Sequence, residues 1–118
     1  MKIKATLVYV MDGEKVLMIH RNRKPGDEHK GKYNGLGGKL EPDEGHLECA
    51  IREVKEESGL DISDLHFKGE ILFPKFDKKG NDWLVYIYRA DQYSNELIKE
   101  NREGDLEWVS RDKLLDLN

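Results

Sequence analysis

Residues 38–60 of this 118-residue chain read GKLEPDEGHLECAIREVKEESGL, and this stretch decides the fold. Its apolar side chains recur at the spacing i, i+3, i+4, i+7, typical of a helix that packs one face on a core: Leu47, Ala50, Ile51 and Val54. We therefore predict a helix over residues 46–58 with these side chains on its core-facing stripe. Gly45 occupies the N-cap position, and Gly59 ends the helix, because glycine readily adopts the left-handed conformation found at helix ends.

Three glutamates of the same helix form a separate cluster beside the apolar stripe. Glu53, Glu56 and Glu57 stand at i, i+3 and i+4, so their carboxylates share one face and border the core. Like charges at these spacings destabilise a helix by roughly 0.2–0.5 kcal/mol per pair, and acidic groups in the last turn oppose the helix dipole. Such local conflicts usually mark a site. A hard divalent cation, Mg²⁺ or Mn²⁺, would compensate for the repulsion. The alternative is a solvated charged face.

The segments outside the helix predict an α/β (α+β) fold in a single domain, residues 1–118. Residues 21–33 form a polar loop, and the glycines that follow indicate a sharp turn or a close backbone approach. Ser110 can cap a final helix over residues 111–117. The order of elements predicts a mixed β-sheet sandwiched between helices. The predicted strands cover residues 4–10, 16–20, 67–76, 83–88 and 106–109, with a hairpin turn at Asp12-Gly13.

The composition excludes several classes of protein. The net charge of −4 argues against a general nucleic-acid grip, which needs a basic face, although a bound cation can still attract a phosphorylated ligand. Cys49 is the single cysteine, so no internal disulfide forms, as expected in a reducing compartment. The sequence shows neither a signal peptide nor the roughly 20 apolar residues of a membrane span. We expect a cytoplasmic protein with no membrane partner and no stable nucleic-acid partner, and homodimer formation is left open.

The fixed residues of this stretch resemble the Nudix box. That signature is Gly, five residues, Glu, seven residues, Arg-Glu-aliphatic, one residue, Glu-Glu, one residue, Gly-aliphatic. A chance match at a given start is on the order of one in a billion with average residue usage. Residues 33–39 and 103–110 also resemble the MutT-like branch, the oxidised purine nucleoside triphosphate pyrophosphohydrolases. The matching positions are Gly38, Glu44, Arg52, Glu53, Val54, Glu56, Glu57, Gly59 and Leu60.

The resemblance implies roles for the residues in and around the box. Glu53 or Glu103 would act as the general base, and Arg52 would fix a box glutamate, with Glu44 its expected partner. Glu100 is a nearby substitute for Glu103. The implied metal ligands are Glu53, Glu56, Glu57, Glu103 and the Gly37 carbonyl, and the candidate substrate contacts are Arg21, Lys39 and Asn34.

The substrate contacts keep plainer alternatives. Arg21 and Lys39 would meet phosphate oxygens, but lone basic residues are often plain surface. Asn34 would read a base edge, but Asn before Gly is also a common turn.

Relatives usually continue into a longer C-terminal helix that helps form the base pocket, and this sequence ends at Asn118. No base-reading residues from such a helix are therefore expected. The aromatic residues that could stack on a base are Tyr33, Phe73, Trp83 and Trp108, most of them expected in the core.

The expected function is Mg²⁺- or Mn²⁺-dependent hydrolysis of a nucleoside diphosphate linked to another group. The favoured substrate is a purine nucleoside triphosphate, with an ordinary or an oxidised (8-oxo-type) base, that yields nucleoside monophosphate and pyrophosphate. One alternative keeps the reaction and changes the substrate to ADP-ribose, a dinucleoside polyphosphate or capped RNA. Another alternative is a nucleotide-sensing or protein-binding domain with a vestigial site. The intact glutamate cluster argues against that last alternative, because nothing else would stabilise it.

Overall fold

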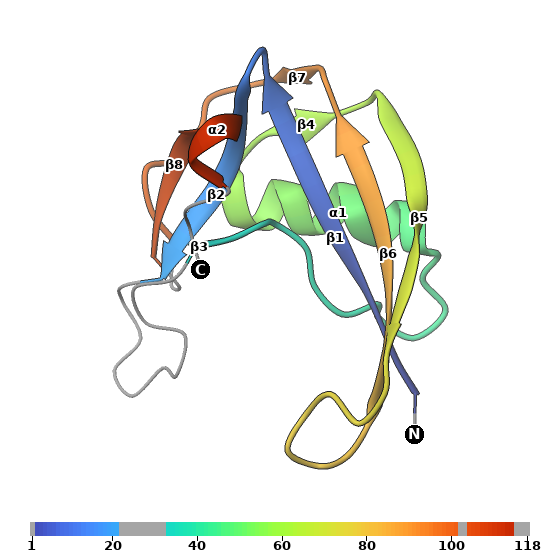
Figure 1. Ribbon diagram of the computed structural model, residues 1–118. Coiled ribbons are helices and arrows are strands. Elements are labelled where there is room, and N and C mark those ends of the chain that lie inside the picture. Colours follow the sequence, from blue (N-terminus) through green and yellow to red (C-terminus); the bar gives the residue numbers. More distant parts are fainter. Residues whose placement is uncertain (1, 22–32, 102–103, 115–118) are drawn as a thin grey trace.

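The computed structural model describes residues 2–21, 33–101 and 104–114, and the side chains of Arg21, Lys113 and Leu114 lie outside that description. Figure 1 shows a mixed sheet with one long helix across one face. In chain order the elements are β1 Lys2–Asp12, β2 Lys15–Arg21, β3 Tyr33–Asn34, α1 His46–Ser58, β4 Asp61–Ile62, β5 Leu65–Phe73, β6 Asp82–Ala90, β7 Tyr93–Ser94, β8 Gly104–Ser110 and α2 Arg111–Leu114.

The main sheet has the strand order β3-β2-β1-β6-β5, and β8 pairs with β2. β1 and β6 run parallel, from the pair Lys2↔Asp82 to the pair Val10↔Ala90, whereas the other pairs are antiparallel. β1 and β2 are paired only next to their turn, and β2 then pairs with β8 along its whole length. β4 and β7 form a small separate sheet. The predicted mixed sheet is confirmed.

The helix α1 has the predicted bounds, but its buried face differs from the predicted stripe. Ala50 and Val54 are fully buried, as expected, whereas Leu47 is 48% exposed and Ile51 is 40% exposed. The prediction was wrong for these two residues. Cys49 is fully buried instead, with its Sγ 3.4 Å from Oγ of Thr6 on β1. The helix is therefore turned so that the flank of Cys49, not the flank of Leu47, rests on the sheet.

This rotation of α1 matters for the site. Cys49, Glu53 and Glu57 follow one another at i+4, so they lie on the same flank of the helix. Because Cys49 faces β1, the two glutamates also face inward, and both are partly buried. The core behind them consists of Val8, Val10, Leu17, Ile19, Leu36, Ala50, Val54, Leu60, Ile62, Tyr88, Ala90 and Leu106.

The longer predicted strands are present, although the strand predicted over residues 67–76 runs from Leu65 to Phe73, and three short strands are new. The hairpin at Asp12-Gly13 forms, and β5 and β6 make a second hairpin with a bulge between Phe67 and Gly69. The unpredicted strands β3, β4 and β7 have two residues each. The final helix begins at Arg111 as predicted, and residues 115–117 of the expected range lie outside the described residues.

Candidate active site

The segment that follows β3 forms one wall of the site. Residues 36–40 run along the free edge of β1, held by three backbone hydrogen bonds: Val8 N to Leu36 O at 2.7 Å, Thr6 N to Gly38 O at 2.8 Å and Leu40 N to Lys4 O at 3.0 Å. The segment is therefore fixed relative to β1 and, through β1, to α1.

Two glycines allow this close approach. Gly37 has a φ of +141°, and a Cβ on it would lie 2.0 Å from the Thr6 carbonyl oxygen. A Cβ on Gly38 would lie 2.7 Å from the carboxylate carbon of Glu53. The glycines thus bring backbone against both the strand and the carboxylate, as the sequence predicted for this stretch.

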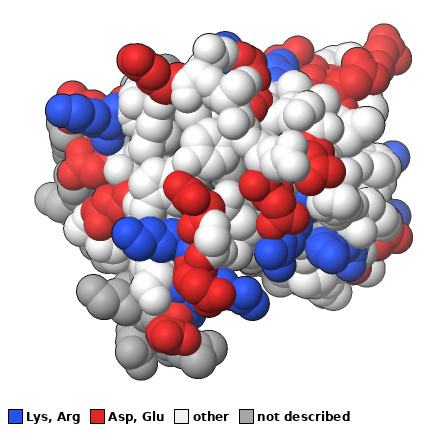
Figure 2. Space-filling view, turned by 90° about the horizontal axis from the view of Figure 1, so that it is seen from above, with Lys and Arg blue, Asp and Glu red and all other residues white. Residues whose placement is uncertain are grey.

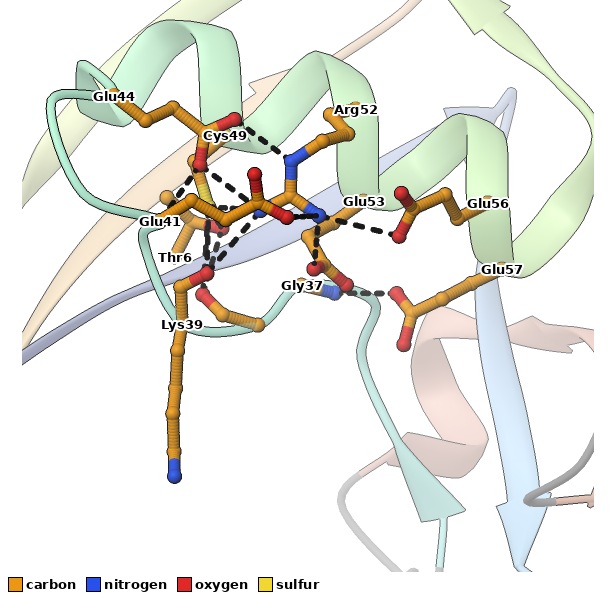
Figure 3. Close-up of polar contacts among 11 residues, drawn as sticks. Thr6, Gly37, Lys39, Glu41, Glu44, Cys49, Arg52, Glu53, Glu56 and Glu57 are labelled. Carbon is orange, nitrogen blue, oxygen red and sulfur yellow. Dashed lines mark hydrogen bonds and ion pairs between the residues drawn. The ribbon is translucent and has the colours of Figure 1, made fainter.

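The three box glutamates differ in environment (Figure 3). Glu57 accepts a hydrogen bond from the Gly37 N–H at 2.8 Å. Glu53 has a side chain only 16% exposed, and burial raises the pKa of its carboxyl, an effect that Arg52 partly offsets. Glu56 is 57% exposed and lies at the solvent edge. Two of the carboxylates therefore face the glycine segment, and the third lies at the solvent edge beside Arg52.

Arg52 connects the glutamates to the preceding loop. Its Nε and Nη2 donate to the two carboxylate oxygens of Glu44 at 2.7 and 2.9 Å, so the expected Arg52–Glu44 pair is confirmed. Its Nη1 donates to Glu53 at 2.8 Å and to Glu56 at 3.2 Å. Hydrogen bonds from Arg52, followed by the Glu41 N–H, lower the pKa of Glu44 to about 2. One guanidinium thus orients three carboxylates (Figure 3).

Two further residues touch this group, although the sequence did not single them out. Glu41 places its Oε1 3.6 Å from Nη1 of Arg52. Asn101 donates from its side chain to the backbone carbonyl of Glu57 at 3.0 Å. Glu41 lies among the five variable residues of the box, and Asn101 is 44 residues from its partner, so neither has a positional signal in the sequence.

The structure leaves some candidates away from the carboxylates. The Lys39 side chain extends away from them, with its Nζ 5.4 Å from the centroid of the Trp83 ring (Figure 3). Asn34 is half-buried on β3, opposite Ile19 of β2. Glu100 is exposed and forms an isolated backbone bridge with Asp105.

Two other candidates cannot be located by their side chains. Glu103 lies outside the described residues. Arg21 ends β2, where its backbone pairs with Gly104, and its side chain lies outside the description. Their expected roles stay predictions.

Among the described residues, one group of three brings potential metal-ligand atoms within 4.8 Å of one another: Asp64, His66 and Asp91. It lies around the start of β5 and just past the end of β6, not on the box helix. Asp64 is paired with His66 at 3.0 Å, and Asp91 with Arg89 at 2.9 Å. Both carboxylates therefore already have a side-chain partner, and the group lies apart from the box helix.

The donor set on α1 fits a hard divalent cation. Glu53, Glu56 and Glu57 offer carboxylate oxygens, the ligands that Mg²⁺ and Mn²⁺ prefer, and Gly37 can add a carbonyl. In this structure Glu56 turns toward Arg52 and Glu57 toward the Gly37 N–H, so the oxygens do not converge on one point. These side chains must therefore rearrange before they can hold one cation together.

Comparison with known proteins identifies the family to which this chain belongs. The NUDIX domain model matches residues 1–118. Two relatives, both oxidized purine nucleoside triphosphate hydrolases, align over 111 residues: the zebrafish (Danio rerio) protein is 40% identical and the mouse (Mus musculus) protein 34%. Each alignment covers 92% of this chain and 67% of the relative, so the chain spans about two-thirds of their length.

A solved structure extends the likeness to the fold. The MutT protein from Bacillus halodurans superposes with a TM-score of 0.84 at 30% identity, covering 98% of this chain and 72% of that one. The chain belongs to the Nudix hydrolase family, and the predicted Nudix fold is confirmed. Nudix hydrolases generally use a divalent metal ion and act on small nucleotide substrates.

The length and apolar character of the helices decide whether one of them could cross a membrane. No helix in the described part of the chain is long and apolar enough to cross a membrane.

Proposed function

We propose that this chain hydrolyses a purine nucleoside triphosphate, with an ordinary or an oxidised base, to the nucleoside monophosphate and pyrophosphate in the presence of Mg²⁺ or Mn²⁺. The observation that carries the proposal is the placement of Glu53 and Glu57 against the glycine segment, with Glu56 beside them and Arg52 holding the group. The names of the zebrafish and mouse relatives support an oxidised purine.

The proposed mechanism assigns each residue a role. Glu53, Glu56, Glu57 and the Gly37 carbonyl would hold the metal, with Glu103 added from the family resemblance. A bound divalent ion neutralises phosphate charge and lowers the pKa of a coordinated water. Glu53 is the proposed general base from the family resemblance, and its nearly enclosed carboxylate lies close to the Gly38 backbone. Glu103 is the alternative base.

Arg52 has a supporting role in this mechanism. Its fork is fixed on Glu44 by two hydrogen bonds, which leaves Nη1 aimed at Glu53 and Glu56. The guanidinium therefore sets the side-chain positions of both carboxylates before substrate arrives, which lowers the cost of ordering them.

The proposed substrate contacts come from residues other than the box carboxylates. Asn34 offers an amide that can donate to and accept from a purine edge. Arg21 and Lys39 would meet phosphate oxygens, and Lys39 must leave the Trp83 ring to do so. Trp83 is half-buried and, with Phe73, is a candidate surface for base stacking.

The wider setting that we propose is a single cytoplasmic domain acting on small nucleotides. On the face seen in Figure 2, acidic and basic side chains are interspersed, and no continuous basic surface is visible. This pattern and the net charge of −4 favour a small phosphorylated ligand over a nucleic-acid strand. A free, buried cysteine is compatible with a reducing compartment. A homodimer remains open to a measurement of molar mass in solution.

A nucleotide panel tests the proposal. Ordinary and oxidised purine and pyrimidine triphosphates, ADP-ribose, dinucleoside polyphosphates and capped RNA are incubated with protein and Mg²⁺, with and without inorganic pyrophosphatase. Purine triphosphates are expected to release phosphate only when pyrophosphatase is present, because the enzyme itself releases pyrophosphate. Phosphate release without pyrophosphatase, or turnover of another class alone, would replace the proposed reaction. No turnover of any nucleotide would favour a sensing or binding domain.

A further inference from the structure

The C-terminal end of α1 is held by a segment that comes just before β8. The last four carbonyls of a helix lack partners within the helix and must find them elsewhere. Here the Gly59 N–H donates to Lys55 O at 2.9 Å, and two more bonds come from further along the chain. The Ile98 N–H donates to Ser58 O at 2.9 Å, and the Asn101 side chain donates to Glu57 O at 3.0 Å.

The contact between this segment and the helix end is close. Gly59 has a φ of +81°, and a Cβ on it would lie 3.1 Å from the Glu96 carbonyl oxygen and 3.2 Å from Cγ2 of Ile98. Leu97, between them, packs against the main core. Residues 96–101 therefore dock on the last turn of the box helix through backbone, side-chain and apolar contacts.

Asn101 makes the link that reaches closest to the carboxylates. Besides the bond to Glu57 O, its Oδ1 accepts from the Gly104 N–H at 3.1 Å, and its own N–H donates to the Gly104 carbonyl at 2.9 Å. One half-buried side chain thus ties the last turn of α1 to the first residue of β8. β8 is itself paired along the whole of β2, so the tether has a rigid anchor.

The tethered turn is the one that carries two of the proposed ligands. Glu56 and Glu57 lie in the last turn of α1, where helices fray most readily. Glu57 is then fixed from two directions, with its carboxylate on the Gly37 N–H and its backbone carbonyl on the Asn101 side chain. Ligand groups need to be held within about 0.5 Å of their working positions, which supporting contacts of this kind provide.

We propose that Asn101 is a positioning residue for the carboxylate site: it holds the last turn of α1 so that Glu56 and Glu57 can bind a divalent cation together. The inference rests on the proposed metal site and adds a residue outside the Nudix box. It does not require Asn101 to touch metal or substrate. The amide acts through the backbone of Glu57, 44 residues away in the chain.

The test compares Mn²⁺ binding in the wild type and in Asn101→Ala by calorimetry. We expect affinity to fall by about tenfold, the lower end of the loss that follows removal of an outer partner of a metal ligand. Hydrogen exchange in metal-free buffer is expected to speed up at the amides of residues 55–58. Both readouts are independent of turnover.

A matched control separates positioning from general destabilisation. Val109 is buried in a second apolar cluster with Met11, Val16 and Met18, so Val109→Ala should lower the melting temperature without touching α1. We expect it to bind Mn²⁺ within twofold of the wild type. If Val109→Ala loses as much affinity as Asn101→Ala, or if Asn101→Ala binds like the wild type, the positioning role is overturned. If the wild type itself binds no Mn²⁺, the proposed metal site fails first.

Discussion

At the scale of single residues, the three box glutamates show that identical side chains on one helix have different tasks. Glu53 is nearly enclosed and is paired with Arg52, Glu57 is fixed by the Gly37 N–H, and Glu56 faces solvent. Arg52 reduces the like-charge repulsion between the glutamates, which their i, i+3, i+4 spacing on the helix predicts. A bound cation is therefore not needed to keep the helix folded. It would instead balance the part of the negative carboxylate charge that one arginine leaves unbalanced.

Neutralising one ligand should abolish activity while leaving the fold intact. In Glu57→Gln the amide oxygen can still accept the Gly37 N–H, so the free energy of unfolding without metal should stay within about 0.5 kcal/mol of the wild type. Turnover with Mg²⁺ should fall by roughly a hundredfold or more, as for loss of a key electrostatic group. Glu56→Gln should behave alike. Glu48→Gln, an exposed first-turn change on the same helix, should leave turnover unchanged. Near-normal turnover in both ligand variants would show that the metal assignment is wrong.

Glu44 predicts a dependence of stability on acidity. Its pKa is about 2 in the folded protein against an ordinary 4.5, mainly because Arg52 hydrogen-bonds the ionised form. A lowered folded-state pKa means that the stabilisation is fully present above pH 4.5 and is lost as pH falls through about 2. Urea unfolding across this range should show a shallower loss in Glu44→Gln than in the wild type. Glu48→Gln should keep the wild-type slope, and equal slopes in all three proteins would contradict the role given to Glu44.

Asn34 tests the identity of the substrate. If its amide pairs with a purine edge, Asn34→Ala should lower kcat/KM for the preferred purine triphosphate by about ten- to a hundredfold, the loss of one buried pairing. A pyrimidine triphosphate should lose less, because contacts with phosphate and metal are shared. Steady-state kinetics on both substrates gives the comparison. Equal losses would identify Asn34 as a turn residue at the end of β3 and leave the base unassigned.

At the scale of elements, the box helix shows which features a sequence can predict. Its bounds were correct because Gly45 and Gly59 delimit the periodic stretch, and Gly59 does adopt the left-handed conformation. Its buried face was only half correct. The periodicity of the apolar residues is compatible with burial of either of two neighbouring flanks of the helix. The flank of Cys49 is the buried one, because β1 covers that side. A small thiol carries less hydrophobic signal than Leu47 or Ile51.

Other elements depend on contacts that no local pattern encodes. The strands β3, β4 and β7 have two residues each and exist because partners distant in the sequence align with them. The Arg52–Glu44 pair could be predicted because both residues belong to one box of fixed spacing. Asn101 could not, since an isolated asparagine in a polar segment has no distinguishing pattern until the chain folds it onto α1.

The glycine segment along β1 gives a prediction for an element. Gly37→Ala introduces a Cβ that would lie 2.0 Å from backbone oxygen, at a φ of +141°. The segment must then move away from β1, and the free energy of unfolding should fall by about 2 kcal/mol or more. Gly80→Ala is the matched control, because Gly80 also has a positive φ (+80°) but a Cβ on it would meet nothing within 4 Å. Chemical denaturation of both variants measures the difference, and equal losses would mean that the close approach contributes nothing.

At the scale of the whole molecule, the proposed site joins parts of the chain that are otherwise separate. α1 contributes the carboxylates, the segment after β3 contributes the glycines, and the segment before β8 holds the helix end. β1 anchors the glycines, and β2 anchors β8, so both sides of the site rest on one sheet. A ligand that bridges α1 and the glycine segment therefore binds the folded chain and not the unfolded one.

Metal binding should for this reason stabilise the whole fold. A ligand present at 100 times its dissociation constant adds about 2.7 kcal/mol to the free energy of unfolding. Mg²⁺ or Mn²⁺ should raise the melting temperature of the wild type, EDTA should reverse the rise and abolish turnover, and fresh metal should restore both. In Glu57→Gln the metal-dependent rise should shrink sharply, because one ligand charge is missing, whereas Glu48→Gln should show the full rise. Full turnover in EDTA would contradict the metal site outright. A metal-dependent rise that survives in Glu57→Gln would place the cation elsewhere, and the group of Asp64, His66 and Asp91 would then be the next site to mutate.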